Sequence, residues 1–238
     1  KVVYFPSCVA RAMGAARGAP ESDSLTTRTA ALLRKAGYDV VYPRRLGELC
    51  CGMAFASKGF KRQGDRKLAE LKEALREASE GGRFPVLFDT SPCLERVREA
   101  LAGEGEPEIF EPARFAERYL VPRLRWTRLP GTVALHVPCS SRKMGLEGAL
   151  RAVAKRCAER VVIPEDVGCC GFAGDRGFHY PELTASALQP LREAIPKDCR
   201  AGYSTSRACE IGLSLHAGIH YRSLFYLVDA ATEPLERR

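Results

Sequence analysis

Two copies of a Cys-Cys-Gly sequence, Cys50-Cys51-Gly52 and Cys169-Cys170-Gly171, constrain this chain more than any other feature. Each copy has a lone cysteine well before it and another well after it. Eight of the ten cysteines therefore form two sets of four, which are Cys8, Cys50, Cys51 and Cys93, and then Cys139, Cys169, Cys170 and Cys209. A set of four that occurs twice in the same order indicates one unit that has been duplicated.

The segments around the cysteines repeat as well. The apolar residues 2–6 before Cys8 correspond to residues 132–137 before Cys139. The period of about 115–125 residues is too long for a solenoid. We therefore predict a first unit at 1–121 and a second at 131–238. The linker at 122–130 is marked by two prolines, three arginines and the only tryptophan.

Short apolar segments alternate with amphipathic ones in each unit, which is typical of a parallel α/β layer. We expect strands at 2–6, 38–42, 84–89, 108–110, 132–137, 160–163, 200–204 and 218–221. We expect helices at 24–36, 65–78, 95–102, 113–120, 146–158, 181–194, 210–216 and 223–231, and a loop at 9–20. The predicted fold class is α/β, with two duplicated three-layer-like units around small parallel sheets. Sites in such sheets lie beyond the carboxyl ends of strands, where all eight paired cysteines fall.

Composition favours metal or redox chemistry for these cysteines. With 238 residues, of which 45% are hydrophobic, the chain can bury a core without disulfides. It has no secretory signal and no apolar run near the roughly 20 residues of a membrane span. It opens directly on a strand, so we expect a piece of a longer chain. These features disfavour a disulfide framework.

The net charge of +8 is spread along the chain, with basic clusters at 58–67 and 114–128. We interpret these clusters as a solvated surface or a docking face for an acidic partner. A basic stripe interleaved with exposed aromatic residues is missing, so no nucleic acid partner is expected. The motifs of dinucleotide, P-loop, serine hydrolase and zinc protease sites are also missing, which excludes those classes.

Four thiolates from three loops suit tetrahedral zinc or an iron–sulfur cluster. Two features favour the cluster. Neighbouring side chains tend to point apart, so a doublet reaches two separate irons more readily than one ion. Gly168, Gly171 and Gly174 also let backbone N–H groups approach anionic sulfur. Core filling is the alternative for buried cysteines, and it is our interpretation of Cys157 and Cys199, which stand outside both sets.

The four histidines are less informative. His136 lies within an expected strand, so it belongs either to the core or to the surroundings of the Cys139 site. His179 follows the second doublet and is either a surface residue or a proton donor near the site. His216 and His220 flank a helix-to-strand turn and are expected to be structural.

The segments Leu135–Cys139, Val167–Gly177 and Tyr203–Gly212 resemble the CCG family of cysteine-rich domains. Such domains occur in heterodisulfide reductase, in the glycolate oxidase iron–sulfur subunit and in the small subunit of anaerobic glycerol-3-phosphate dehydrogenase. They also form a tandem region at the C-terminus of large FAD-linked D-lactate dehydrogenases. Essentially the whole of this chain resembles that tandem region.

The resemblance implies an electron-transfer module that is not catalytic alone. All eight paired cysteines would be ligands, with a [4Fe-4S] cluster expected and zinc as the alternative. FAD would belong to a partner domain or subunit, and a quinone or another carrier would accept the electrons. A cytoplasmic location is implied, with attachment to the inner face of a membrane through partners as a variant. A zinc-binding or metal-free assembly module, or a heterodisulfide-reductase-like subunit, are the other interpretations.

One departure from the family pattern bears on the chemistry. The heterodisulfide reductase repeat ends in Cys-x-x-Cys, but Thr90 and Ser206 stand where the first cysteine of that pair would be. Four cysteines in place of five favour electron relay over direct cleavage of a disulfide. The second set has the richer glycine surroundings, so we expect it to be the main holder of a cluster.

Overall fold

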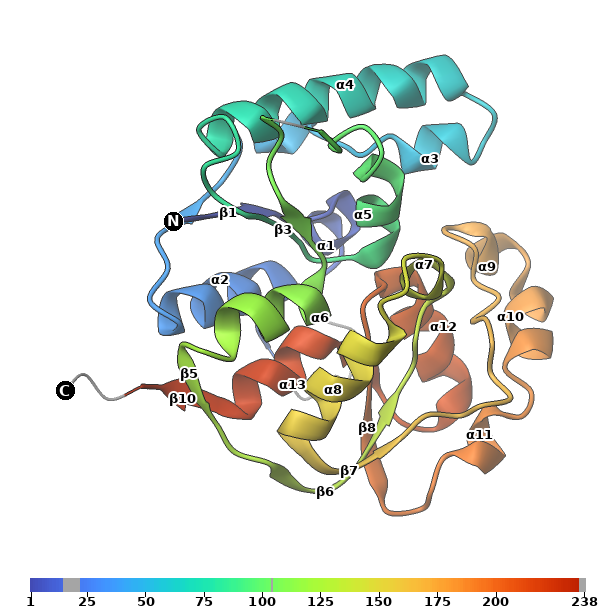
Figure 1. Ribbon diagram of the computed structural model, residues 1–238. Helices are drawn as coiled ribbons and strands as arrows, with labels where there is room; N and C mark the ends of the chain where they lie inside the picture. Colours follow the sequence, from blue (N-terminus) through green and yellow to red (C-terminus); the bar gives the residue numbers. More distant parts are fainter. Residues whose placement is uncertain (15–21, 104, 236–238) are drawn as a thin grey trace.

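The computed structural model describes residues 1–14, 22–103 and 105–235, and two parallel four-stranded sheets form its framework (Figure 1). The first sheet has the order β2-β1-β3-β4, with β1 (Val2–Phe5), β2 (Val40–Val41), β3 (Val86–Phe88) and β4 (Ile109–Phe110). The second has the order β7-β6-β8-β9, with β6 (Leu129–Leu135), β7 (Ala158–Val162), β8 (Cys199–Ser204) and β9 (Tyr221–Ser223). The α/β class and the small parallel sheets are confirmed, and the matching strand orders reproduce the repeat seen in the sequence.

Helices surround both sheets. The first half contains α1 (Cys8–Ala12), α2 (Leu25–Lys35), η1 (Leu46–Glu48), α3 (Met53–Ala56), α4 (Lys61–Ala78), α5 (Ser91–Val97), α6 (Pro112–Phe115) and the π-helical turn η2 (Ala116–Leu120). The second half contains α7 (Cys139–Lys143), α8 (Glu147–Cys157), α9 (Arg176–His179), α10 (Pro181–Ala187), α11 (Leu191–Ala194), α12 (Arg207–Ala217) and α13 (Leu224–Ala230). Among the described residues, no helix is long and apolar enough to cross a membrane.

The helix that best matches its sequence signals is α2. The Ser24 hydroxyl accepts a hydrogen bond from the backbone N–H of Thr27 at 3.2 Å, which caps the first turn. Gly37 follows the helix with a φ of 81° and ends it in the left-handed conformation. A serine cap and a terminal glycine are local features, so the sequence locates this helix to within a residue at each end.

Three expectations about elements were wrong. Residues 8–12 form α1 and not a loop, because the Ser7 hydroxyl accepts the N–H of Ala10 and caps a first turn; residues 15–20 of that expected loop lie outside the described residues. The single helix expected at 181–194 is divided into α10 and α11 at Pro190, which has no N–H to continue the first helix. The helix expected at 95–102 begins earlier, at Ser91, and ends at Val97, as α5.

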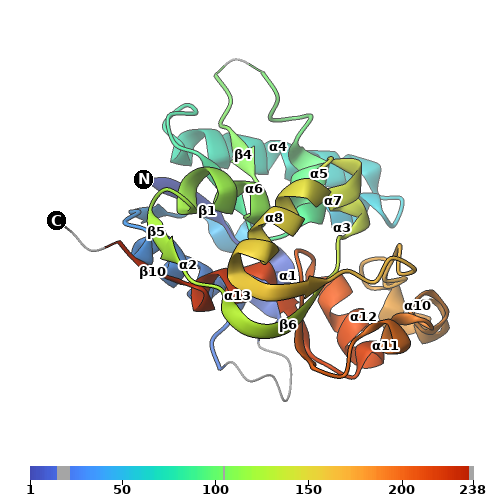
Figure 2. The same cartoon turned by 60° about the horizontal axis from the view of Figure 1, so that its bottom comes forward.

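The expected linker holds a strand. β5 (Leu124–Trp126) pairs antiparallel with β10 (Thr232–Pro234), so that the end of the described chain returns to the segment between the halves (Figure 2). Each strand has only three residues, which is too short for a periodic pattern to identify it. Their pairing joins residues about a hundred positions apart in the sequence.

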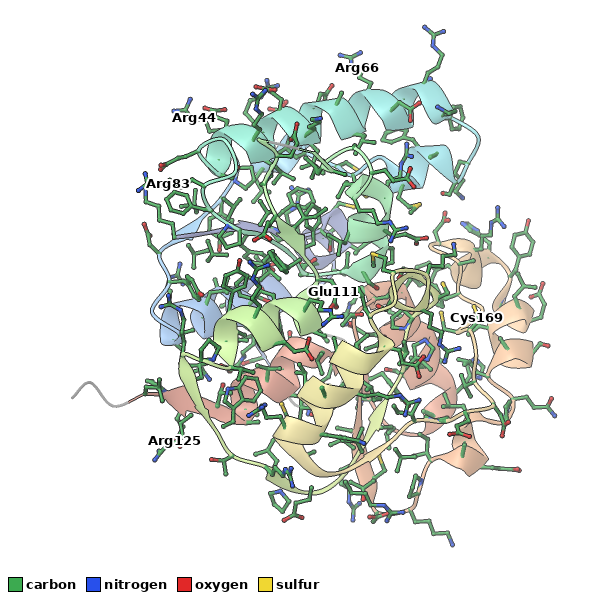
Figure 3. The ribbon with its side chains drawn as sticks, viewed as in Figure 1. Arg44, Arg66, Arg83, Glu111, Arg125 and Cys169 are labelled. Carbon is green, nitrogen blue, oxygen red and sulfur yellow. The ribbon has the colours of Figure 1, made fainter. Side chains whose placement is uncertain are left out.

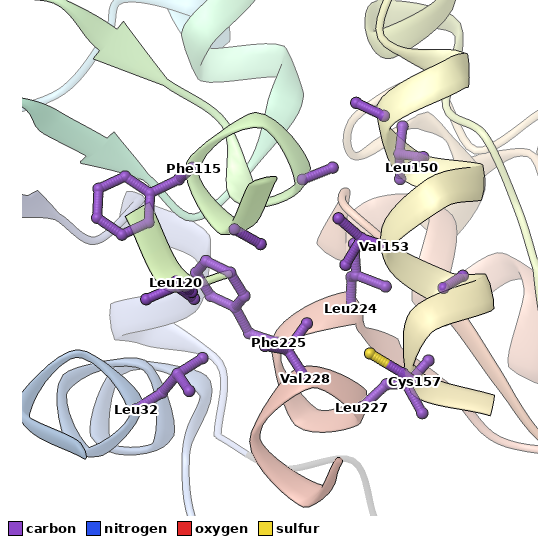
Figure 4. Close-up of a cluster of buried hydrophobic side chains, with 14 of the residues drawn as sticks. Leu32, Phe115, Leu120, Leu150, Val153, Cys157, Leu224, Phe225, Leu227 and Val228 are labelled. Atoms are coloured by element: carbon purple, nitrogen blue, oxygen red, sulfur yellow. The ribbon is translucent and has the colours of Figure 1, made fainter. Parts of the chain in front are cut away.

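The largest hydrophobic core is built by both halves together. α13 packs against α2, α6 and α8, and α6 also packs against α8 (Figure 4). Phe115 of α6, Leu150 of α8 and Phe225 of α13 have no exposed surface in this cluster. Burying a side chain of this size stabilises a fold by about 1.5–3 kcal/mol. Cys157 lies in the same cluster, in agreement with its expected place in the core.

Candidate functional site

Each half of the molecule brings its four cysteines together at the carboxyl edge of its sheet. Cys8 and Cys139 begin the short helices α1 and α7, which follow the central strands β1 and β6. Cys93 and Cys209 lie in α5 and α12, which follow β3 and β8. The doublets lie in the loops that follow β2 and β7. Both sites therefore draw on three loops from neighbouring strands.

In the first site, the sulfur of Cys51 lies 3.2 Å from that of Cys93. Hydrogen bonds from Cys51 and then Cys8 hold the pKa of Cys50 far below its usual range. The same contacts with Cys50 raise the pKa values of Cys51 and Cys8, and burial adds to both shifts. The backbone N–H of Gly52 also donates to the Cys50 sulfur, at 3.3 Å. All four thiols of the set thus interact in one place.

In the second site, the sulfurs of Cys170 and Cys209 lie 3.0 Å apart. The hydrogen bond from Cys209 lowers the pKa of Cys170 to about 7, and the contact with Cys170, together with burial, raises that of Cys209. Burial, followed by the charges of Cys169 and Cys170, raises the pKa of Cys139, which places that thiol beside the doublet. Figure 3 shows Cys169 on the side of the molecule that carries α7 and α9.

The two members of each doublet face different surroundings. Cys51 and Cys170 are buried, at 3% and 5% exposed, and contact the cysteine from the next strand end. Cys50 is half-buried and Cys169 is exposed, and each accepts an N–H from the glycine two residues later. The two thiols of each doublet thus have different neighbours, but in the first site Cys50 and Cys51 also contact each other, so the expectation that neighbouring thiols point apart was wrong there.

The glycine after each doublet is required by its backbone. Gly52 and Gly171 have φ values of 80° and 66°. A Cβ added to Gly52 would lie 2.1 Å from the carbonyl oxygen of Gly64, and one added to Gly171 would lie 2.6 Å from that of Leu183. Each turn therefore needs both a left-handed conformation and a close approach of two backbones, which only glycine allows.

The donor set decides which groups these sites could hold. Within the part of the chain that the structure describes, no three His, Cys, Asp or Glu side chains are arranged to bind a single metal ion. Four thiols in each site, with N–H groups aimed at the outer sulfur, match the ligands of an iron–sulfur cluster in type and number. Zinc takes the same ligands but needs all four sulfurs around one ion. In type and number, the donors of each site therefore match both a thiolate-bound cluster and a zinc ion.

A buried line of hydroxyl groups ties the two sites together, and the sequence did not reveal it. We call Ser91, Ser140 and Thr205 the hydroxyl seam. The Ser91 and Ser140 hydroxyls lie 2.7 Å apart, and the carbonyl of Thr205 accepts the Ser91 N–H at 2.9 Å and its hydroxyl at 3.2 Å. All three residues are buried. The seam joins the strand ends that lead into Cys93, Cys139 and Cys209.

The two residues that stand in place of a fifth cysteine differ in role. The Ser206 hydroxyl donates a hydrogen bond to the Cys209 sulfur, within its own site. The Thr90 hydroxyl donates to the carbonyl of Thr205 in the other half, at 3.2 Å. The first therefore stabilises a thiol of the second set, whereas the second extends the connection between the sites.

Removing the Ser91 hydroxyl is expected to weaken the whole fold. Ser91→Ala removes the partner of the buried Ser140 hydroxyl, which costs about 1–3 kcal/mol. Urea unfolding of the metal-free protein measures this loss. Ser57→Ala is the control, because the Ser57 hydroxyl bonds only to its own helix, and it should change stability by no more than about 0.5 kcal/mol. Equal effects of the two changes would show that the seam carries no particular stability.

The histidines take different places. His136 is buried, and its burial, followed by the charge of Arg142, lowers its pKa to about 4. It lies at the end of β6 on the path to Cys139, while His179 is exposed in α9 with its Nε2 4.0 Å from an Asp175 oxygen. His216 ends α12 and His220 precedes β9, so both lie at the amino edge of the sheet, away from the cysteines. Cys199 is buried in the core, as expected.

Among the described residues, three buried carboxyl groups were missed in the sequence, those of Asp89, Glu111 and Glu210. Asp89 follows β3 and accepts the Tyr4 hydroxyl and the Ser7 N–H, both at 3.0 Å. Glu111 is fully buried at the start of α6, where it accepts the N–H of Arg114 at 2.8 Å, and burial raises its pKa to about 7 (Figure 3). Glu210 is buried in α12 and pairs with Arg207 at 3.2 Å, and burial likewise raises its pKa to about 7. An acidic residue on a helix normally signals a surface, so no local pattern identifies either glutamate.

Known proteins match most of this chain. Aspartate racemase from Picrophilus torridus superposes with a TM-score of 0.43 and 11% sequence identity, over 99% of this chain and 96% of its own. The matched subunit of anaerobic glycerol-3-phosphate dehydrogenase from Escherichia coli, in strains K12 and O157:H7, is 26% identical over 199 residues. That match covers 71% of this chain and 49% of the subunit, so the chain spans about half the length of these relatives.

The family comparison repeats the internal duplication. The model of the cysteine-rich domain, CCG, matches residues 2–94 and again residues 133–213, which is well over half of the chain. Each match contains one full set of four cysteines. The chain belongs to the CCG family of cysteine-rich domains and carries two copies of the domain.

Proposed function

We propose that this chain is the electron-transfer module of a flavin-linked dehydrogenase, and that its two sets of four cysteines bind iron–sulfur clusters. The observation that carries the proposal is the convergence of four thiols, twice, at sheet edges that the hydroxyl seam joins. A likeness to a dehydrogenase subunit supports the same class of function. The chain would not be catalytic alone, because flavin chemistry would belong to a partner domain or subunit.

The residues of the chain would have three tasks. The cysteines hold the metal centre: Cys139, Cys169, Cys170 and Cys209 in one half, and Cys8, Cys50, Cys51 and Cys93 in the other. The N–H groups of Gly52 and Gly171 stabilise the negative charge on the outer sulfurs and so tune the reduction potential. The seam keeps the ligands of the two sites in fixed register. A bound [4Fe-4S] cluster would supply reversible one-electron transfer.

The substrate class and the acceptor extend this proposal. A 2-hydroxy acid of the D-lactate or glycolate type would reduce the flavin, and a quinone or another carrier would accept the electrons. The name of the matched subunit supports glycerol-3-phosphate as a second candidate substrate. The module would work in the cytoplasm, held at the inner face of a membrane by its partners.

Anaerobic purification, followed by measurement of iron and acid-labile sulfide, tests the proposal. We expect both elements in the protein after anaerobic reconstitution, with a larger share of iron lost when a paired cysteine is changed than when Cys199 is changed to alanine. Zinc without sulfide would favour a structural or assembly module. Absence of iron and sulfide after reconstitution would refute the proposed electron-transfer function.

A further inference from the structure

Exposed apolar side chains gather on one face of the molecule. Nine large hydrophobic side chains are exposed among the described residues, and five of them lie in the short ranges 53–60 and 176–183. These five are Phe55, Phe60, Phe178, Tyr180 and Leu183, which are 38% to 57% exposed. The ranges comprise α3 with the turn after it, α9 and the first three residues of α10, and these helices lie on the same side of the molecule in Figure 1. We call them the α3–α9 face. Exposed apolar groups at this density mark a binding surface.

The two parts of the face meet at a hollow. Its volume is about 520 Å³, and Lys58 from the first half lines it together with Arg176, His179, Tyr180 and Leu183 from the second. Lys58 also forms an ion pair with Asp175 at 2.7 Å. The side chain of His179 is 67% exposed and Tyr180 is 55% exposed, so the hollow is open. A pocket for a small ligand normally encloses most of the ligand's surface. Because this hollow is open, it is better suited to binding a protein partner than a small molecule.

The face is attached to both cysteine doublets. α3 begins at Met53, two residues after Cys51. In the second half, the rings of Phe172 and Phe178 meet edge to face at 4.9 Å, and a Cβ on Gly177 would lie 2.5 Å from the Phe172 ring. Phe172 follows Cys170 by two residues. A protein bound here would lie beside the loops that hold both thiol pairs.

Charge identifies the kind of occupant. Lys58, Arg176 and His179 surround the hollow, with Asp175 as the acidic neighbour. Among the described residues, no carboxylate lies within ion-pair distance of Arg176. A second copy of this chain would bring another net charge of +8 against the face, which disfavours self-association there. Aromatic residues with arginine and a positive rim are typical of an interface with an acidic protein.

We propose that the α3–α9 face is the docking surface for an acidic redox protein, the flavin-bearing donor of the proposed function. The identity of the donor rests on that function, whereas the surface rests on exposure, shape and charge. Aromatic side chains would supply the contact area, and Lys58 and Arg176 would steer the partner by its negative charge. Electrons would then enter beside the two doublets.

Titration of the fluorescence of an acidic FMN flavodoxin with this protein, over a range of salt concentrations, tests the surface. The double variant Lys58→Glu with Arg176→Glu is expected to weaken binding at least tenfold and to flatten the salt dependence. Phe60→Ala with Tyr180→Ala is expected to weaken it severalfold at every salt concentration. Arg44→Glu with Arg83→Glu makes the same change in charge at exposed positions on the opposite side of Figure 3, and less than a twofold effect is expected.

Flavodoxin binding can be measured whether or not the protein contains iron. The proposal for the α3–α9 face and the proposed electron-transfer function can therefore be contradicted independently. Flavodoxin binding by a protein that takes up no iron would support the face and contradict the proposed function. Iron uptake without flavodoxin binding would overturn the face alone. Equal weakening by the face variants and by the Arg44 and Arg83 control would also overturn it, because the attraction would then be an effect of net charge.

Discussion

The change Cys170→Ser is expected to remove more iron from the reconstituted protein than Cys51→Ser. The backbone N–H groups of Phe172 and Ala173 lower the pKa of Cys170, and that of Met53 has the same effect on Cys51 but is outweighed there by the contacts with Cys50 and Cys93 and by burial. Amide donors stabilise the thiolate of a ligand, and serine provides a poorer ligand for iron. If both sites fill, Cys170→Ser should cost roughly half of the iron or more, and Cys51→Ser less than that.

Iron and sulfide per chain, measured after anaerobic reconstitution, give the result directly. Cys199→Ala is the matched control, because Cys199 is a buried cysteine outside both sets whose thiol donates to the carbonyl of Ala201. Its iron content should equal that of the unchanged protein. Equal iron losses from Cys51→Ser and Cys170→Ser would refute the ranking of the second site above the first, while leaving the assignment of both as metal sites intact.

The change Gly52→Ala is expected to have the largest effect on stability. Its Cβ would lie 2.1 Å from the carbonyl oxygen of Gly64, a contact with backbone that no rotamer relieves. The φ of 80° adds the strain of a left-handed conformation, about 1–2 kcal/mol. Clash and strain together should cost about 3 kcal/mol or more. Urea unfolding of the metal-free protein measures the loss without any contribution from a bound group.

Gly59→Ala separates the two causes. Gly59 has a φ of 86°, close to that of Gly52, but nothing lies within 4 Å of where its Cβ would be. Gly59→Ala should therefore lower stability only through the strain of the left-handed backbone, by about 1–2 kcal/mol. If Gly52→Ala and Gly59→Ala were equally unstable, the clash expected between the added Cβ and the Gly64 carbonyl of α4 would contribute nothing to the loss of stability.

The sequence predicted the framework because its signals are local or periodic. Apolar strand segments, the Ser24 cap and the glycine after α2 each act within a few residues. The duplicated cysteine order placed the sites, because residues that follow neighbouring parallel strands must meet at one edge of the sheet. The stripe of leucines in α4 likewise depends only on the period of a helix, and Leu71 and Leu75 are buried as that period requires.

The features that the sequence did not reveal depend on partners far along the chain. Ser91 and Ser140 carry no distinguishing sequence signal, and their hydroxyls come together only where α5 of one half meets α7 of the other. β5 becomes a strand because β10 returns to it. Glu111 is buried because α6 packs against α8 of the other half, and its helix position alone predicts an exposed carboxylate. Each of these requires the arrangement of the halves, which a single sequence does not specify.

The core shared by α6, α8 and α13 has a consequence for how such a chain could arise. A single repeat would leave the apolar side of α6, or of α13, facing water, and could cover it only with a second copy of itself. The tandem chain is in this sense a homodimer joined end to end. Fusion also frees the two copies to diverge, and Asp89 follows β3 where Thr205 follows the corresponding strand β8.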